Sequence, residues 1–294
     1  MNKISKILFT LIGLFIILFF VVDYINDNTP KYNDYNGNVE VYFIDVGEAE
    51  SILINNKGSY MLIDGGNNKD GKALVKYLKS LGINRFNYVI GTHAHEDHIG
   101  GLDYIIKEFD VEKFYMPATL VPTLSYEDVV KALKKKNIKY NIPYEGEILN
   151  MNDMKFEVLS VKDNIDDLNN SSIVLKMTYK DYKFLFMADV ESPIEEELIS
   201  SGENIEADVL KVGHHGTRYA STDKFLSAVN PKYAVIMCGK DNDYGHPHKQ
   251  ALNRLKNRHI PIYRTDLDGT IIFKINKDGI TVDTVKTNTN VEDK

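Results

Sequence analysis

Residues 92–101 read Thr92-His93-Ala94-His95-Glu96-Asp97-His98-Ile99-Gly100-Gly101. Three imidazoles and the carboxylate of Asp97 place four potential metal ligands within six residues. One ion needs only three or four ligands, with further carboxylates that orient the imidazoles. An alternating His-x-His pair can hold one ion, and the adjacent Asp-His pair can hold a second. The stretch therefore predicts a metal centre, because a role in helix capping or at the surface leaves the clustered histidines unexplained.

Seven of the eight histidines fall into three clusters along the chain. The first lies in residues 92–101, the second is His214 and His215, and the third is His246 and His248. Each cluster follows an expected strand, and loops at one rim of a sheet gather functional groups. We therefore expect the three clusters to meet at such a rim.

The pattern of apolar residues predicts strands and helices on both sides of residues 92–101. Strands are expected at 39–45, 50–55, 60–64, 87–91, 111–116, 172–179, 182–187, 207–212, 233–238, 270–275 and 280–284, and strands dominate 147–188. Helices are expected at 72–81, 99–109, 127–136, 194–200 and 248–258. Two runs of strands with helices between and around them indicate two sheets sandwiched by helices. Periodicity alone leaves the choice between α/β and α+β open.

The composition excludes several classes of protein. The chain has 294 residues, of which 43% are hydrophobic and 26% charged, so wholesale disorder is excluded. Cys238 is the one cysteine, which excludes an intramolecular disulfide framework and a cysteine zinc finger. The net charge of -7 argues against a surface that coats nucleic acid or anionic membrane. A nuclease stays open, because metal ions can supply positive charge locally.

An apolar run, ILFTLIGLFIILFFVV, occupies residues 7–22 after Lys3 and Lys6. The run is close to the length of about 20 residues that spans a bilayer, and no small-x-small cleavage pattern follows it. Residues 1–22 are therefore predicted to be a membrane anchor or an uncleaved signal. The lysines before the run and Asp23 after it predict a cytoplasmic N-terminus.

This topology predicts a single-pass protein of the cell membrane with an extracytoplasmic domain at residues 39–285. Residues 23–38 are rich in Asn, Asp, Tyr, Pro and Gly and are an expected linker. Residues 286–294 are an expected polar tail. Secretion after signal cleavage is the alternative.

The motif His93-x-His95-x-Asp97-His98 resembles the signature of the metallo-β-lactamase fold. Six further segments resemble, in order, motifs of the hydrolase domain of ComEC-type competence proteins and their free-standing relatives. These segments are residues 45–50, 62–66, 169–172, 186–189, 210–217 and 245–248. The resemblance extends over residues 39–285. It implies a four-layer αββα sandwich, preceded here by the N-terminal transmembrane helix.

Two departures from the resemblance bear on function. Glu48, Ala49 and Glu50 stand where these relatives have Gln, Gly and Asp, so that a carboxylate is kept at position 50 on a longer arm. No histidine lies between His98 and Asp189, so the third histidine of ordinary metallo-β-lactamases is absent. That absence disfavours a β-lactamase.

Carried over by position, the resemblance implies two bound metal ions. The implied ligands are His93 and His95 for one ion, Asp97, His98 and His214 for the other, and Asp189 as the bridge. His214 is preferred to His215 because only one of two adjacent side chains at a strand end normally faces a given site. Imidazole and carboxylate donors without thiolate favour Zn²⁺ first and Mn²⁺ second.

The same resemblance assigns chemical roles. Two ions roughly 3.5–4 Å apart would hold a bridging hydroxide and stabilise the attacking and leaving oxygens of a phosphoryl transfer. The candidate catalytic residues are Asp97, His215 and His246. His246 is expected to bind phosphate or protonate the leaving oxygen, and a turn position before Pro247 is its alternative. The residues expected to support the ligands or contact substrate are Asp45, Glu50, Asp64, Asn170, Ser172, Lys211 and Thr217.

These assignments predict a phosphodiesterase or nuclease acting on a phosphodiester, with DNA as the substrate that the resemblance implies. The alternatives are a cell-envelope phosphodiesterase similar to phosphorylcholine esterases and a non-catalytic metal-binding module. The intact ligand set counts against the last. The basic run at 131–139 is interpreted as a solvated helix face rather than a nucleic-acid footprint. The sequence indicates no obligate protein partner.

The predicted topology can be tested on intact cells. Protease added outside should degrade residues 39–285, because the apolar run is expected to leave them on the outer side of the membrane. Immunoblotting of the remaining chain measures this. A domain that stays fully protected until the cells are lysed would reverse the topology.

Overall fold

The computed structural model describes residues 39–119, 121–163 and 166–286. The predicted anchor at 1–22, the linker at 23–38 and residues 287–294 of the expected tail lie outside the described residues. Among the described residues, no helix has both the length and the apolar character to cross a membrane.

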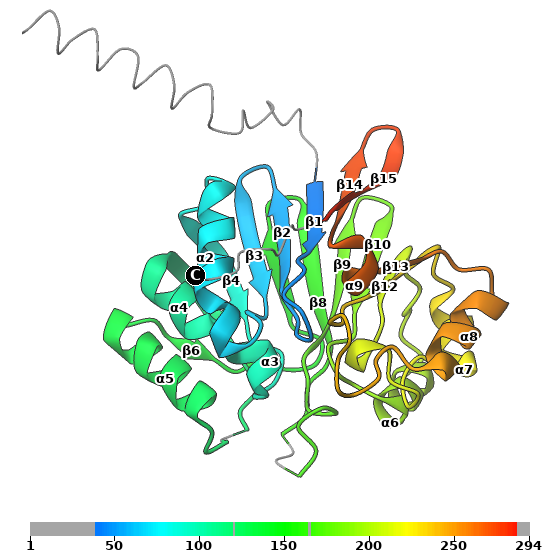
Figure 1. Ribbon diagram of the computed structural model, residues 1–294, viewed down its shortest axis with the longest axis horizontal. Coiled ribbons are helices and arrows are strands. Elements are labelled where there is room, and N and C mark those ends of the chain that lie inside the picture. Colours follow the sequence, from blue (N-terminus) through cyan, green and yellow to red (C-terminus); the bar gives the residue numbers. More distant parts are fainter. Residues whose placement is uncertain (1–38, 120, 164–165, 287–294) are drawn as a thin grey trace, which may run out of the picture. The chain divides into compact units, whose positions relative to one another are not determined.

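The described residues build two mixed β-sheets that face each other (Figure 1). The first has the strand order β15-β14-β1-β2-β3-β4-β5-β6. Its strands are β1 (Val39–Phe43), β2 (Ile52–Asn56), β3 (Ser59–Ile63), β4 (Arg85–Ile90), β5 (Asp110–Tyr115), β6 (Tyr140–Asn141), β14 (Thr270–Asn276) and β15 (Gly279–Val285). Strands β3 to β6 pair in parallel, whereas β15, β14, β1, β2 and β3 pair antiparallel.

The second sheet has the order β13-β12-β11-β10-β9-β8-β7. Its strands are β7 (Ile148–Met151), β8 (Met154–Ser160), β9 (Val174–Tyr179), β10 (Tyr182–Phe186), β11 (Val209–Lys211), β12 (Tyr233–Ile236) and β13 (Ile262–Arg264). Strands β10 to β13 are parallel and β7 to β10 antiparallel. Each sheet therefore has a parallel portion, and the loops that follow its strands reach a common edge.

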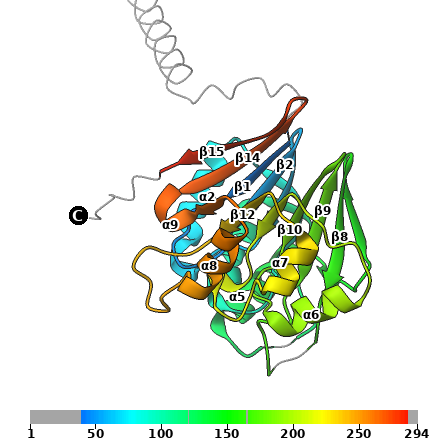
Figure 2. The ribbon, with the colours of Figure 1, turned by 90° about the vertical axis from the view of Figure 1, so that its right-hand side faces the viewer.

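Helices cover the outer face of each sheet (Figures 1 and 2). The first sheet carries α2 (Gly71–Ser80), α4 (Leu102–Glu108) and α5 (Leu124–Lys136), and the second carries α6 (Ser192–Ser200), α7 (Asp223–Val229) and α8 (Lys249–Asn257). Short helical turns lie in the loops: η1 (Asn68–Asp70), α3 (Glu96–Ile99), η2 (His214–Gly216) and α9 (Thr265–Asp268). This is the four-layer αββα sandwich that the resemblance implied.

Three apolar clusters hold these layers together. The central one lies between the sheets, and one lies under each helical layer. Strand β1 contributes side chains to two of these clusters. Val41 and Phe43 belong to the central cluster, whereas Tyr42 belongs to the cluster under α2 and α4. Side chains alternate between the two faces of a strand, so both faces of β1 are buried, and its one charged residue, Glu40, accepts hydrogen bonds from Tyr42 and Asn55.

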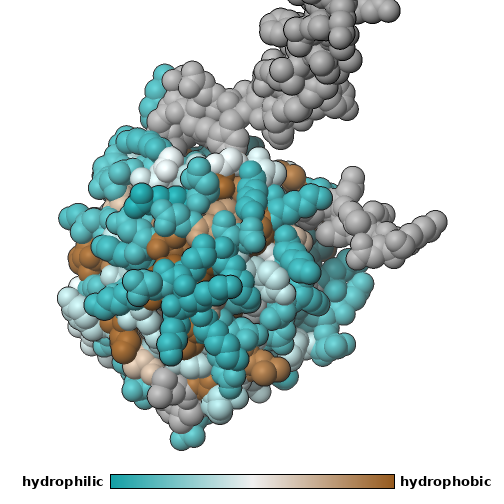
Figure 3. All heavy atoms as spheres, turned by 90° about the vertical axis from the view of Figure 1, so that its left-hand side faces the viewer, coloured by the Kyte–Doolittle hydropathy of each residue, from teal (hydrophilic) through white to brown (hydrophobic). Residues whose placement is uncertain are grey.

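The outer face of the α2, α4 and α5 layer is mostly hydrophilic, with scattered apolar side chains (Figure 3). The lysine-rich end of α5 contributes exposed Lys134, Lys135 and Lys136 to the surface. This arrangement agrees with the interpretation of that run as a solvated helix face. The helix begins earlier than the predicted 127–136, because the side chain of Thr123 accepts a hydrogen bond from Tyr126 N and caps it.

The helix predicted at residues 99–109 begins later in the structure, as α4, and the short turn α3 precedes it. The two glycines between them pack closely against the backbone of the loop after β3. A Cβ at Gly101 would lie 2.1 Å from Gly65 O, and one at Gly100 would lie 2.4 Å from Asn68 N. These contacts press residues 92–101 against the loop that follows β3. Helix α7 and the short elements β6, β13 and α9 were not predicted.

The central cluster predicts a measurable loss of stability. Phe273 is fully buried, and its ring packs against Phe43 and Phe184 at centroid distances of 5.8 Å. Phe273→Ala should lower the free energy of unfolding by about 3–5 kcal/mol, measured by denaturant titration. Tyr144→Ala, at a side chain that is 65% exposed, is the control and should change it by no more than about 0.5 kcal/mol. Equal effects of the two substitutions would contradict this placement of the core.

Candidate metal centre

The loop after β4 is fixed by a buried carboxylate from the loop after β3. Asp64 accepts hydrogen bonds from Thr92 N at 2.8 Å and from Thr92 Oγ1 at 2.7 Å. Its Oδ2 also lies 2.7 Å from Nδ1 of His98. Because a carboxylate only accepts hydrogen bonds, Nδ1 of His98 carries the proton and Nε2 is the ring atom left for a ligand. Asp64 thereby orients His98.

Four donors from both sheets converge beside this loop. Ligand atoms of Asp97, His98, Asp189 and His215 all lie within 4.8 Å of one another. Nε2 of His98 is 3.3 Å from Asp189 Oδ1, and Nε2 of His215 is 3.2 Å from Asp97 Oδ2. His98 Nε2 and Asp189 Oδ1 are buried without a hydrogen-bond partner. Buried polar atoms without partners are costly, and these donor types are those that divalent ions prefer, so the residues fit a metal ion.

A second group of imidazoles lies near Oδ2 of Asp189. Nε2 of His93 is 4.0 Å from Asp189 Oδ2, and Nδ1 of His95 is 3.0 Å from that same His93 nitrogen. Nε2 of His214 is 3.7 Å from Asp189 Oδ2. The carboxylate of Asp189 therefore lies within reach of both groups of donors.

The expectation that only one of His214 and His215 faces the site is not met. Both side chains come within 4 Å of Asp189 Oδ2, at 3.7 and 3.6 Å. The reason is local: His214 and His215 have φ angles of 44° and 50°, so the chain turns instead of continuing strand β11. The four-donor group contains His215 rather than the preferred His214.

Hydrogen bonds from the far side of each ring orient these two histidines. Nδ1 of His215 lies 2.8 Å from the carbonyl oxygen of Met237, and Nδ1 of His214 lies 2.9 Å from Oε1 of Glu191. In both rings Nε2 is left toward Asp189. A carbonyl or carboxylate behind a ligating imidazole is the usual arrangement at metal sites.

The pKa shifts differ among the histidines of the centre: burial lowers the pKa of His93 and His95, whereas that of His98 and His215 is raised. Burial lowers the pKa of His98, but the carboxylates of Asp189, Asp64 and Asp97 outweigh it and raise that pKa well above its ordinary value. Burial likewise opposes the effect of Asp189 on His215, whose pKa is raised to about 9. The pKa of Asp189 is held well below its usual range: burial alone would raise it, and the neighbouring histidines overcome that. Bound cations would neutralise the negative charge of these carboxylates.

A buried ion pair holds the backbone just before Asp189. Lys211 and Glu50 are both fully buried and pair with each other. Lys211 Nζ also donates to the carbonyl oxygen of Ala188 at 2.9 Å. Ala188 has a φ of 44°, which aims the next residue, Asp189, into the centre. Burial raises the pKa of Glu50, with Lys211 opposing this.

His246 lies in a cavity of about 370 Å³ over the centre, with its ring fixed by a carboxylate. Nδ1 of His246 is 2.8 Å from Oε1 of Glu48, and Oε2 of Glu48 accepts from Gly239 N at 2.5 Å. Tyr244, which is 70% exposed, stacks on the His246 ring at 5.6 Å with an interplanar angle of 13°. His215 and Asp97, the other two candidate catalytic residues, line the same cavity.

The remaining predicted residues shape loops around the centre. Asn170 Oδ1 accepts from Glu191 N at 2.9 Å, and Ser172 Oγ donates to Asn169 O at 2.7 Å. Thr217 N donates to His214 O at 2.8 Å, which closes the turn of η2. Asp45 Oδ1 accepts from Gly47 N at 3.2 Å, and Asp45 lines a different cavity.

Sequence reasoning missed three residues of this site: Glu48, Glu191 and Tyr244. The departure from Gln at position 48 was a signal for the first, because a new carboxylate there can hold a histidine. Glu191 lies two residues beyond Asp189, which was a weaker signal. Nothing in the sequence distinguished Tyr244 from the other 17 tyrosines.

Two facing sheets between helices, with histidines and aspartates at the strand ends, define a metal-dependent hydrolase fold in general terms. Residues 44–240 match the model of the Metallo-beta-lactamase superfamily, and the chain belongs to this superfamily.

Within the superfamily the chain is similar to competence proteins. It is 32% identical over 254 residues to ComE operon protein 3 of Bacillus subtilis (strain 168), covering 80% of this chain and 33% of that protein. It is 29% identical over 238 residues to Competence protein ComA of Neisseria gonorrhoeae, covering 80% and 32% respectively. The chain thus spans about a third of the length of these curated relatives. The resemblance to ComEC-type proteins is confirmed.

Solved structures show the same fold at low sequence identity. The metallo-β-lactamase fold protein YhfI from Bacillus subtilis has a TM-score of 0.53 at 13% identity, covering 81% of this chain and 99% of that chain. Igni18, a metallo hydrolase from Ignicoccus hospitalis, has a TM-score of 0.54 at 14% identity, covering 81% and 100%.

The role of Asp64 predicts an effect on metal affinity. Asp64→Asn keeps the shape of the side chain but removes the charge that holds His98 in its ligating orientation. Metal affinity should fall about 10–100-fold, measured by competition with a chromophoric chelator. The control is Asp128→Asn, at a carboxylate on α5 whose side chain is 43% exposed, which should leave affinity unchanged. An unchanged affinity for the Asp64 variant would contradict the assigned role.

Proposed function

We propose that this protein is a binuclear metal-dependent phosphodiesterase, with nuclease activity as its most specific form. The observation that supports this most is the position of Asp189. Its buried carboxylate lies within 4.0 Å of imidazole nitrogens from His93, His98, His214 and His215. One carboxylate within reach of both groups of donors is the arrangement that a bridging ligand requires.

The donors divide into two sets around Asp189. His93, His95 and Asp189 would hold one ion, with His214 within reach of it. Asp97, His98, Asp189 and His215 would hold the other. This assignment uses both adjacent histidines, where the sequence had indicated only one. Oxygen and nitrogen donors favour Zn²⁺, with Mn²⁺ as the alternative.

Divalent ions bound there would supply Lewis-acid chemistry, lowering the pKa of water and stabilising negative charge on phosphate oxygens. The chain itself supplies orientation and a proton donor. Glu48 holds Nδ1 of His246, so that Nε2 of this ring is the atom available to substrate in the cavity. From there His246 can donate a hydrogen bond to phosphate or a proton to the leaving oxygen.

The proposed substrate is a phosphodiester, with DNA first. One relative, Competence protein ComA of Neisseria gonorrhoeae, is named for competence, which supports a nucleic-acid substrate. The exposed ring of Tyr244 beside His246 offers a surface on which a base can stack. We also propose that the apolar run at 7–22 anchors the chain in the cell membrane with the catalytic domain outside, as the flanking charges indicate.

An assay on the full-length protein tests the activity. After chelation and repletion with Zn²⁺ or Mn²⁺, the protein should cleave single-stranded DNA and bis(p-nitrophenyl) phosphate, and chelator should abolish both activities. Duplex DNA and a phosphocholine diester are the comparison substrates. Asp189→Asn and His95→Ala should each lower kcat by at least about a thousandfold, because several kcal/mol of transition-state stabilisation depends on the ions.

Asp110→Asn is the matched control, because that carboxylate is 70% exposed on the first sheet. It should retain full activity. Absence of diester cleavage under every metal condition would refute the proposed function. Cleavage of the phosphocholine diester alone would point to the envelope substrate instead.

A further inference from the structure

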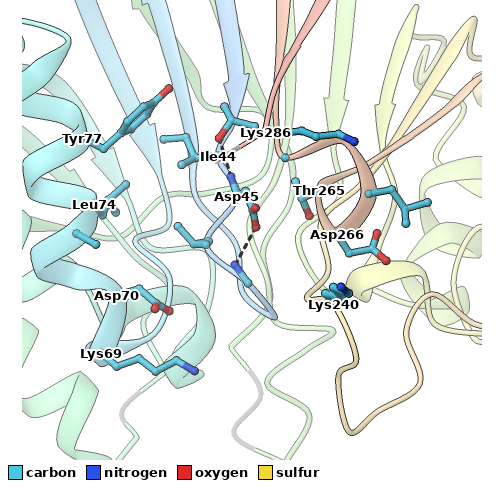
Figure 4. Close-up of a pocket in the computed structure, with 16 residues that line it drawn as sticks. Ile44, Asp45, Lys69, Asp70, Leu74, Tyr77, Lys240, Thr265, Asp266 and Lys286 are labelled. Carbon is cyan, nitrogen blue, oxygen red and sulfur yellow. Dashed lines mark hydrogen bonds between the residues drawn. The ribbon is translucent and has the colours of Figure 1, made fainter. Parts of the chain in front are cut away.

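A second and larger cavity, of about 570 Å³, lies in the domain outside the metal cavity (Figure 4). It is an open groove, lined on one side by η1 and α2, on the other by α9 and Lys240, and in the middle by residues 44–47. None of the donors around Asp189 lines it. We refer to it as the α2–α9 groove.

The α2–α9 groove and the metal cavity are lined by residues that are neighbours in the chain. Gly47 lines the groove, and the next residue, Glu48, lines the metal cavity and holds His246. Lys240 likewise follows Gly239, whose N–H donates to Glu48. A linear substrate bound at the metal centre could therefore continue past these residues into the groove.

The groove offers apolar side chains on both of its sides. Tyr77 of α2 is half-buried, whereas Ile44 and Leu74, which also line the groove in Figure 4, are only 4% and 2% exposed. On the opposite side Leu267 of α9 is 58% exposed. Flat rings can pack on such a surface, whereas a chain of sugar alcohols and phosphates gains little there.

Exposed lysines stand at the rim. Lys69 and Lys240 lie on opposite sides of the groove in Figure 4, and in the described part of the chain neither forms an ion pair. Lys286 also lines the groove, and so do three carboxylates. Asp266 forms an ion pair with Arg264, Asp70 accepts a hydrogen bond from Asn67 at 3.0 Å, and Asp45 accepts one from Gly47 N at 3.2 Å. The lining therefore combines three lysines with three carboxylates, one of which is paired with an arginine.

We propose that the α2–α9 groove binds a segment of single-stranded nucleic acid that flanks the phosphodiester held at the metal centre. Lys69 and Lys240 contact its phosphates, and Tyr77 with the apolar surface contacts its bases, a combination typical of sequence-independent single-strand binding. This proposal rests on the proposed phosphodiesterase function for its substrate class. It adds a binding site that extends recognition beyond one diester.

The test compares binding and cleavage in matched charge variants of the full-length protein. Lys69→Glu/Lys240→Glu is compared with Lys134→Glu/Lys135→Glu, which makes the same charge change on the exposed face of α5. A fluorescent 20-nucleotide oligothymidylate is the binding probe, read by anisotropy, and bis(p-nitrophenyl) phosphate reports on the metal centre alone. The groove variant should bind the oligonucleotide about tenfold more weakly and lose about 1.4 from the slope of log K against log salt, because two phosphate contacts disappear. Its hydrolysis of the small diester should not change.

Three outcomes would overturn the proposal. They are unchanged oligonucleotide binding in the groove variant, equal weakening in the α5 variant, and loss of binding to phosphatidylglycerol vesicles in place of the oligonucleotide. The binding readout does not depend on cleavage. If no diester is hydrolysed by any variant, the proposed function fails, and anisotropy still decides whether the groove holds a single strand.

Discussion

The carboxylate of Asp189 is almost completely buried in the loop after β10, within 4.8 Å of the Asp97 carboxylate and close to four imidazoles. Acidic groups so close together can be buried only if positive charge is buried with them. The rest of the domain meets this condition. The parallel strands of each sheet bring their loops to one edge, and those loops supply imidazoles that can be protonated or can bind a cation. The electrostatic balance at Asp189 thus links the fold to its chemistry.

The ligands are held by contacts that reach well beyond them. Asp64 fixes His98, Met237 O fixes His215, and Lys211 holds the turn that aims Asp189. Glu50 stands where the ComEC-type relatives have Asp. Its longer side chain still places a carboxylate against Lys211, close to the metal centre. Because these supports come from both sheets, the site is built by the whole sandwich and not by the histidine loop alone.

Much of this could be predicted from the sequence. The strands lie near their expected positions because buried strands are continuous apolar runs, and the motif in residues 92–101 indicates the metal centre through local spacing. Other features depend on contacts that no local pattern contains. Glu48 and His246 are 198 residues apart, and their pairing exists only in the folded chain. The left-handed backbone at His214 and His215, which turns both rings toward Asp189, follows from packing, as does the α2–α9 groove.

The origin of the donors in both sheets has a consequence for the stability of the protein. His93, His95, Asp97 and His98 follow strands of the first sheet, whereas Asp189, His214 and His215 follow strands of the second. Ions held between them would cross-link the two sheets, so that folding and metal binding become linked equilibria. A concentration of ion one hundred times its dissociation constant would add about 2.7 kcal/mol to the free energy of unfolding. Scarcity of the metal would then remove the protein by unfolding and proteolysis, as well as by loss of activity.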